Sequence, residues 1–128
     1  MPRNISFMLT KPQFLDQTKT VTRRMGWYFL EPGDILNGCE KCQGLRKGET
    51  IKKLGQIRIV NVRREPLWHI SQEDCIAEGF PEMSPWEFIE FFCSTHKGCD
   101  PDTEITRIEF EYCESRSEKP KFEQIRLF

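Results

Sequence analysis

The sequence feature that most constrains the fold is the strict alternation of apolar and polar residues in Glu104–Tyr112. The apolar set is Ile108, Phe110 and Tyr112, and the polar set is Arg107, Glu109 and Glu111. A period of two places these sets on opposite faces of a β-strand. The segment therefore predicts a strand with an inward apolar face and an outward charged face.

Three shorter segments in the first third of the chain also favour extended structure. Residues 4–10 place Ile5, Phe7 and Leu9 on one face, and Thr20–Thr22 is rich in β-branched residues. In Glu31–Asp34, proline presets φ and glycine supplies a positive φ, which indicates a turn. We expect a strand over 34–38 that leaves this turn.

A fifth strand is predicted over Gln56–Arg64. Its apolar residues change phase, from Ile57 and Ile59 to Val60 and Val62. Such a change indicates either a β-bulge or a strand that is buried on both faces.

Helix signals lie between these strands. Pro12 favours a short helix to about Thr18 because proline is tolerated in a first helical turn. Residues 71–78 have Ser71 as N-cap and acids in the first turn, and Gly79 ends the segment. In Ser84–Phe92, a capping box and a proline at the first helical position predict another helix.

These elements predict one α+β domain: a small mixed β-barrel of about five or six strands with two or three short helices. We assign 1–113 to this domain, with 39–55 as an exposed loop insertion. Residues 114–128 form a polar C-terminal tail whose last residues add a strand or dock as an arm. No apolar run approaches the roughly 20 residues of a membrane helix. The first residues lack a secretory signal, so we expect a cytoplasmic protein with no membrane partner.

The net charge of −1 hides two opposed halves. Residues 41–64 contain eight basic residues and one acid, whereas 71–114 contain twelve acids and two bases. This asymmetry favours a basic face for phosphates if the fold gathers those residues. The other interpretation is a set of scattered, solvated lysines and arginines.

Six cysteines without an export signal favour reduced thiols or a metal site over disulfides. Two half-sites have zinc spacing, and together they offer a tetrahedral Cys3His set. The four candidate ligands are Cys39, Cys42, His96 and Cys99, with Cys93 as a rival for His96. Zinc would fix the insertion, but the same residues also fit ordinary half-buried side chains, so no cofactor is required.

Lys19–Arg24, with the sequence KTVTRR, carries a recognisable pattern. The chain resembles ASCH domains of the PUA-like superfamily. Their pattern is a strand, a short helix, Lys-Thr-x-Thr-x-Arg and then a Pro-Gly-Asp turn, which is Pro32–Asp34 here. A long basic strand, a helix ending in Glu78-Gly79-Phe80, a second helix and a last strand follow. The resemblance covers residues 4–113 and extends to phage-encoded proteins of unassigned function.

This resemblance implies a PUA-like barrel that handles RNA or a modified nucleoside. Some small bacterial members are amidohydrolases that remove the acetyl group from N4-acetylcytidine. Their lysine, threonine and glutamate correspond to Lys19, Thr22 and Glu78. The glutamate match is the weakest because this chain is longer after Gly79. The rival acids are Glu73, Asp74 and Glu82.

The residues themselves set a geometric demand on such a site. In a regular strand Lys19 and Thr22 would point to opposite faces, so a shared pocket requires the backbone to turn there. Thr22 would then serve as the nucleophile, Lys19 as the base and Glu78 as the acid. Arg24 or a backbone N–H would hold the oxyanion.

Two other functions compete with this assignment. In a non-catalytic RNA-binding or regulatory module, arginines would contact phosphates while aromatic rings stack on unpaired bases. The candidate contact residues are Arg23, Arg24, Trp27, Tyr28, Arg58 and Arg63. A ribonuclease is a weaker alternative, in which a lysine and a glutamate activate the 2′-hydroxyl.

Overall fold

The computed structural model describes residues 2–42 and 47–113. The tail predicted over 114–128 lies outside the described residues. The strands are β1 (Arg3–Ser6), β2 (Val21–Arg24), β3 (Ile35–Cys39), β4 (Lys53–Pro66) and β5 (Glu104–Tyr112). The α-helices are α1 (Lys11–Leu15), α2 (Gln72–Ala77) and α3 (Pro85–Thr95), and two 3-10 turns are η1 (Met8–Thr10) and η2 (Leu67–His69).

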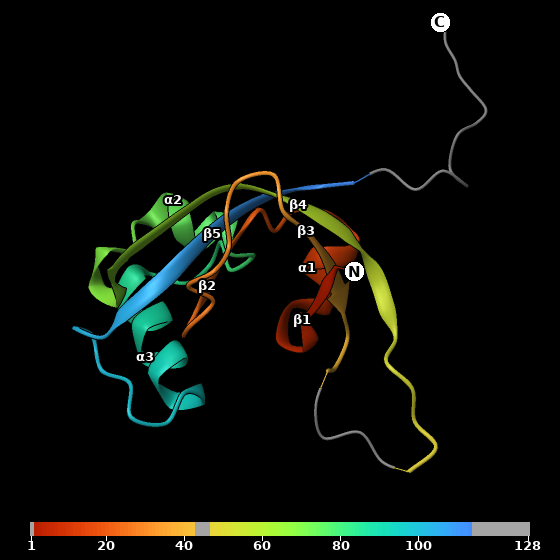
Figure 1. Cartoon of the computed structure of the whole chain (residues 1–128). Coiled ribbons are helices and arrows are strands. Elements are labelled where there is room, and N and C mark those ends of the chain that lie inside the picture. Colours follow the sequence, from red (N-terminus) through yellow and green to blue (C-terminus); the bar gives the residue numbers. More distant parts are fainter. Residues whose placement is uncertain (1, 43–46, 114–128) are drawn as a thin grey trace, which may run out of the picture.

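The five strands form one mixed sheet in the order β1-β3-β4-β5-β2. The β1–β3 pair is parallel and the other pairs are antiparallel. The 14-residue strand β4 pairs with β3 through its first half and with β5 along most of its length. Figure 1 shows β4 and β5 arching over the molecule, with α3 beneath one end and α1 and β1 beneath the other. The sheet is therefore a curled half-barrel, and the predicted α+β class is confirmed.

The strand predictions hold best where the alternation is strongest. Strand β5 spans Glu104–Tyr112 as predicted, with Ile108 and Phe110 buried. Strand β4 is longer than predicted, and its pairing with β5 shifts register between Ile59 and Asn61. The shift coincides with the change of phase in the sequence and confirms the bulge.

The N-terminal predictions need correction. The strand expected over 4–10 ends at Ser6, and η1 follows, closed by a hydrogen bond from the Thr10 backbone N–H to the Phe7 carbonyl. The helix expected from Pro12 to Thr18 ends at Leu15, and Gln17 has a φ of 64°. The chain therefore turns sharply between α1 and β2.

The capping predictions for α2 and α3 are confirmed. Ser71 Oγ accepts a hydrogen bond from the Asp74 backbone N–H, and Ser84 with Glu87 forms a capping box. No helix in the described ranges has the length and apolar character needed to cross a membrane.

Two separate apolar clusters form the core. The first lies where β1, β3, the start of β4 and the end of β5 meet α1, and it includes Phe7, Phe14 and Phe110. The second lies between α2, α3 and the far end of the sheet, and it includes Leu67, Phe88 and Ile105. Gly38 allows the Phe14 ring to pack directly against the backbone of β3, because a Cβ at this position would lie 2.5 Å from the ring. Strand β2 runs between the two clusters.

Candidate functional site

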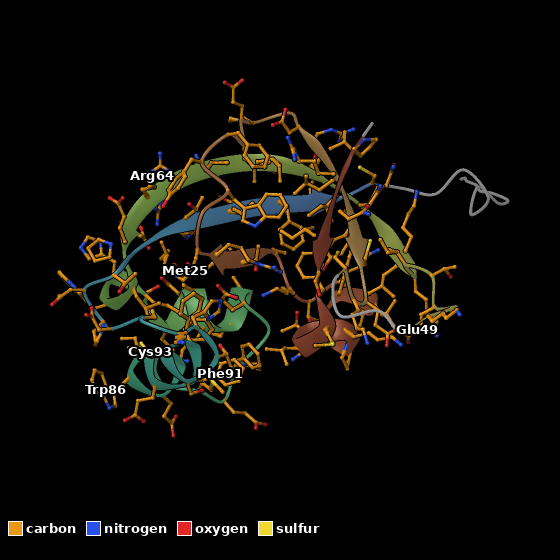
Figure 2. All side chains as sticks on the ribbon, turned by 60° about the horizontal axis from the view of Figure 1, so that its bottom comes forward. Met25, Glu49, Arg64, Trp86, Phe91 and Cys93 are labelled. Carbon is orange, nitrogen blue, oxygen red and sulfur yellow. The ribbon has the colours of Figure 1, made fainter. Side chains whose placement is uncertain are left out.

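A cavity of about 230 Å³ lies between η1, β2, the end of α2 and α3. Its walls come from both core clusters, since Phe7 belongs to one and Phe88 to the other. In Figure 2, Phe91 lies on the flank of α3 toward the N-terminal helices, whereas Trp86 projects outward. Phe91 lines the cavity together with Met8 and Leu9 of η1.

Lys19 and Glu78 form a buried ion pair at this cavity. Lys19 Nζ donates to Glu78 Oε1 at 2.7 Å and to the Glu78 backbone carbonyl at 2.8 Å. Both side chains are almost fully buried, with 2% and 4% exposure. Burial lowers the pKa of Lys19; the Glu78 carboxylate opposes this effect, and the charges of Arg24 and Arg23 add to it.

Thr22 and Lys19 line the same cavity, which is possible because Lys19 lies outside the strand that contains Thr22. Lys19 belongs to the segment between α1 and β2, so the alternation of β2 does not govern its direction. Within β2, Thr22 and Arg24 share a face, and Arg24 Nε donates to Thr22 Oγ1 at 3.0 Å. Lys19, Thr22, Arg24 and Glu78 therefore line one cavity, which meets the geometric demand of the sequence pattern.

Arg23 joins the cavity to a network of carboxylates behind it. Its Nη2 donates to Glu65 Oε2 at 2.5 Å and to Asp74 Oδ2 at 2.7 Å, and Nη1 lies 3.7 Å from Glu78 Oε2. Arg107 donates two further hydrogen bonds to Asp74. Burial raises the pKa of Asp74, but the hydrogen bonds from Arg107 and Arg23 outweigh it and lower the pKa to about 2.

Two polar atoms at the base of the site face each other at 3.7 Å without forming a hydrogen bond. Glu78 Oε2 and Arg23 Nη1 are buried, and neither has a hydrogen-bond partner in the described part of the protein. Buried polar groups normally are hydrogen-bonded, so these two atoms indicate a place for water or a ligand group.

The structure distinguishes Glu78 from its rival acids. Glu73 and Glu82 are exposed, and Asp74 pairs with arginines rather than with Lys19. Glu78 alone among these four carboxylates forms an ion pair with Lys19.

The sequence interpretation did not assign the aromatic wall of the cavity. This wall consists of Phe80, Phe88, Phe91, Phe92 and His96. The phenylalanines of α3 recur at positions i, i+3 and i+4, so one helical face carries them all. That spacing was the available signal, but it equally describes a helix packed on a core.

The remaining predicted binding residues do not lie at this cavity. Trp27 lines a separate surface hollow with Arg3 and Phe29, and Tyr28 is exposed beneath the Arg64 guanidinium. The described structure therefore separates Arg23 and Arg24 from the aromatic residues predicted to act with them.

The two basic residues predicted on β4 already have acidic partners. Arg58 pairs with Glu111 at 2.9 Å, and Arg63 pairs with Glu65 at 2.7 Å. These contacts leave the sheet with less uncompensated positive charge than the sequence blocks suggested.

The predicted zinc ligands form two pairs. Cys39 and Cys42 lie at the end of β3 and just beyond it, while Cys93 Sγ and Cys99 Sγ lie 3.7 Å apart near the end of α3. The His96 ring stacks on Phe92, with centroids 3.9 Å apart. Over residues 2–42 and 47–113, no three His, Cys, Asp or Glu side chains gather around a common metal position. Zinc binding would require these pairs to approach, and it stays a prediction.

Comparisons with known proteins establish the fold. The sequence matches no protein-family model and no curated protein sequence. The structure is similar to the crystal structure of protein EF3133 from Enterococcus faecalis V583, of family model DUF984, with a TM-score of 0.62 and 17% identity. That match covers 88% of this chain and 77% of the other.

A second similar structure is that of the hypothetical protein PH0355, with a TM-score of 0.60 and 12% identity. It covers 88% of this chain and 97% of the other. At these identities the similarity concerns the fold alone.

Proposed function

We propose that this protein is an ASCH-type amidohydrolase that removes the acyl group from an N-acylated nucleoside such as N4-acetylcytidine. The observation that carries the proposal is the meeting of Lys19, Thr22 and Glu78 at one cavity, although Glu78 is far from the other two in sequence. The ordered motifs that resemble ASCH domains support the same assignment. A nucleophile, a base and an acid are the groups that amide hydrolysis needs.

In the first half of the reaction, Thr22 Oγ1 attacks the acyl carbonyl carbon and its proton passes to Lys19 Nζ. This transfer requires neutral Lys19, and burial together with Arg24 and Arg23 favours that form by lowering the Lys19 pKa. The 2.7 Å hydrogen bond to Glu78 gives the displaced lysine proton an acceptor. Arg24 or a backbone N–H stabilises the oxyanion.

Collapse of the tetrahedral intermediate breaks the C–N bond. Glu78 delivers its proton to the departing amine, which leaves an acyl ester on Thr22. Lys19 then passes the proton that it took from Thr22 to the Glu78 carboxylate across their hydrogen bond, which makes Lys19 neutral again. Water attacks the ester while Lys19 accepts its proton, and Lys19 gives this proton to Thr22 Oγ1 as the carboxylic acid leaves. The phenylalanine wall gives a planar base an apolar surface on which to lie.

The direct test is incubation with a panel of N-acylated nucleosides, with chromatography to detect the deacylated product. The wild-type protein should deacylate at least one of them. Thr22→Val, which keeps the shape but removes the hydroxyl, should lower kcat about 1,000-fold or more. Thr20→Val is the matched control, because Thr20 is exposed just before the same strand, and it should keep full activity.

If no member of the panel is processed at high protein concentration, the amidohydrolase assignment is wrong. A non-catalytic RNA-binding module would then be the better interpretation. RNA binding that weakens steeply with salt and is unaffected by Thr22→Val would support it.

A further inference from the structure

The charged groups at the cavity differ in how well they are compensated. Lys19 has the Glu78 carboxylate at 2.7 Å. Arg23 has ion pairs with Glu65 and Asp74 and a longer one with Glu78. Both cations thus have an anionic partner inside the protein.

Arg24 is the exception. Its Nε donates to the Thr22 hydroxyl and its Nη2 to the Ser6 backbone carbonyl, and both acceptors are neutral. The guanidinium also lies over the Phe7 ring, 5.1 Å from its centroid. No carboxylate among the described residues forms an ion pair with it.

This lack of compensation has an energetic consequence. Burial lowers the pKa of Arg24 to about 10, although the charge of Glu78 opposes the shift. The group still carries its charge at neutral pH, and its side chain is half-buried. A charge that is partly removed from water gains from an anionic partner.

We propose that Arg24 binds an anionic group of the ligand, so that the substrate carries a carboxylate or a phosphate beside its scissile amide. That the ligand is a substrate rests on the proposed function, but anion binding by Arg24 does not depend on catalysis. Arg24 lines the cavity, and beside its bonds to Thr22 and Ser6 the guanidinium keeps N–H groups on Nη1 and Nη2 that can donate to either anion.

The cavity supplies the rest of the recognition. Arg23 also lines the cavity, and its Nη1 makes no hydrogen bond among the described residues, although it lies 3.7 Å from Glu78 Oε2, so it is a weaker second donor. The phenylalanines of α3 form the apolar side. The favoured ligand is therefore an N-acylated aromatic compound with an anionic group, such as a nucleotide, rather than a neutral nucleoside.

The first experiment measures anion binding without turnover. Inorganic phosphate and acetate are titrated separately into wild-type protein by calorimetry. At least one should bind, which also identifies the preferred anion. Arg24→Gln should weaken that binding about tenfold or more, because it removes a charged fork. Arg58→Gln removes an exposed arginine that is paired with Glu111, and it should bind like wild type.

Folding of the variants is checked by circular dichroism. Arg24→Lys, which keeps the charge but not the fork, replaces Arg24→Gln if the latter does not fold, and it should also weaken binding. The proposal is overturned if wild type binds neither anion, or if a folded Arg24 variant binds as tightly as wild type.

The second experiment compares N4-acetylcytidine 5′-monophosphate with N4-acetylcytidine as substrates. Wild type should show about a tenfold lower KM for the phosphate form, and Arg24→Gln should remove this preference. An equal loss of kcat for both substrates, with KM unchanged, would mean that Arg24 serves only the oxyanion. If neither compound is hydrolysed, the proposed function fails while the calorimetric result still decides the anion site.

Discussion

At the scale of single residues, the burial of Lys19 carries the most information. The side chain is 2% exposed and donates hydrogen bonds to the carboxylate and the backbone carbonyl of Glu78. A buried ion pair contributes little to stability because desolvation offsets the attraction. A buried lysine with a lowered pKa beside a cavity is therefore better explained by function than by folding.

The carboxylate network behind Arg23 predicts how the protein responds to acid. Because the pKa of Asp74 falls from 3.8 to about 2 on folding, the unfolded chain binds the proton first as the pH drops. The stabilisation is complete above 3.8 and is lost toward 2, and it amounts to about 2 kcal/mol. Urea unfolding of wild type across this range should show the loss, and Asp74→Asn should show a smaller one.

The matched control for this experiment is Glu82→Gln, which changes an exposed carboxylate. It should follow the wild-type dependence on pH. An Asp74→Asn protein that loses stability as steeply as wild type would contradict the role given to the network.

At the scale of elements, the end of α2 fixes the position of the acid. Glu78 is the C-cap of this short helix, and its carbonyl accepts a hydrogen bond from Lys19. Gly79 follows with a φ of 100°, and its carbonyl accepts a hydrogen bond from Gln13 Nε2. The orphan carbonyls of a helix end are thus satisfied by α1 and by the segment leading into β2.

Substitution of Gly79 should therefore destabilise the protein and disturb the site together. A Cβ at this position would lie 2.9 Å from Gln13 Cγ, in addition to the strain of a left-handed conformation. Gly79→Ala should lower the free energy of unfolding by about 2 kcal/mol and reduce kcat. Urea unfolding and hydrolysis assays measure the two effects.

Gly98 offers the control, since its φ is also positive at 77° but a Cβ would meet nothing within 4 Å. Gly98→Ala should cost only the backbone strain, about 1 kcal/mol. Equal losses in the two variants would show that the contact with Gln13 is unimportant.

The elements also show what a sequence can and cannot reveal. Strand β5 and the caps of α2 and α3 follow from local patterns, because alternation and capping involve residues close in the chain. The ion pairs of Arg23 with Glu65 and Asp74 join residues 42 and 51 positions apart. No local pattern encodes such a distance, and the network was therefore not predicted.

The assignment of Lys19, Thr22 and Glu78 rests on family resemblance, since the sequence alone does not show whether Lys19 and Thr22 reach one pocket. The turn after α1 makes this possible, and the left-handed Gln17 in that turn has no clear signal in the sequence. His96 stays a predicted metal ligand from its spacing to Cys99, and in the structure its ring stacks on Phe92 at the cavity wall.

At the scale of the whole molecule, the cavity occupies the junction of two core clusters under one curled sheet. Strand β2 carries Thr22 and Arg24 into this junction, while α2 and α3 supply the acid and the aromatic wall. Proteins EF3133 and PH0355 share the fold at low identity. Since one fold hosts many activities, the function depends on the side chains at the junction.

The central claim is that Thr22 becomes acylated during turnover. The most direct measurement is mass spectrometry of protein quenched in acid during hydrolysis of a slowly processed N-acylated nucleoside. We expect a mass increase equal to one acyl group, mapped to Thr22 by peptide sequencing and missing from Thr22→Val. Product formation with an unmodified Thr22, or an acyl group mapped to Lys19, would contradict it.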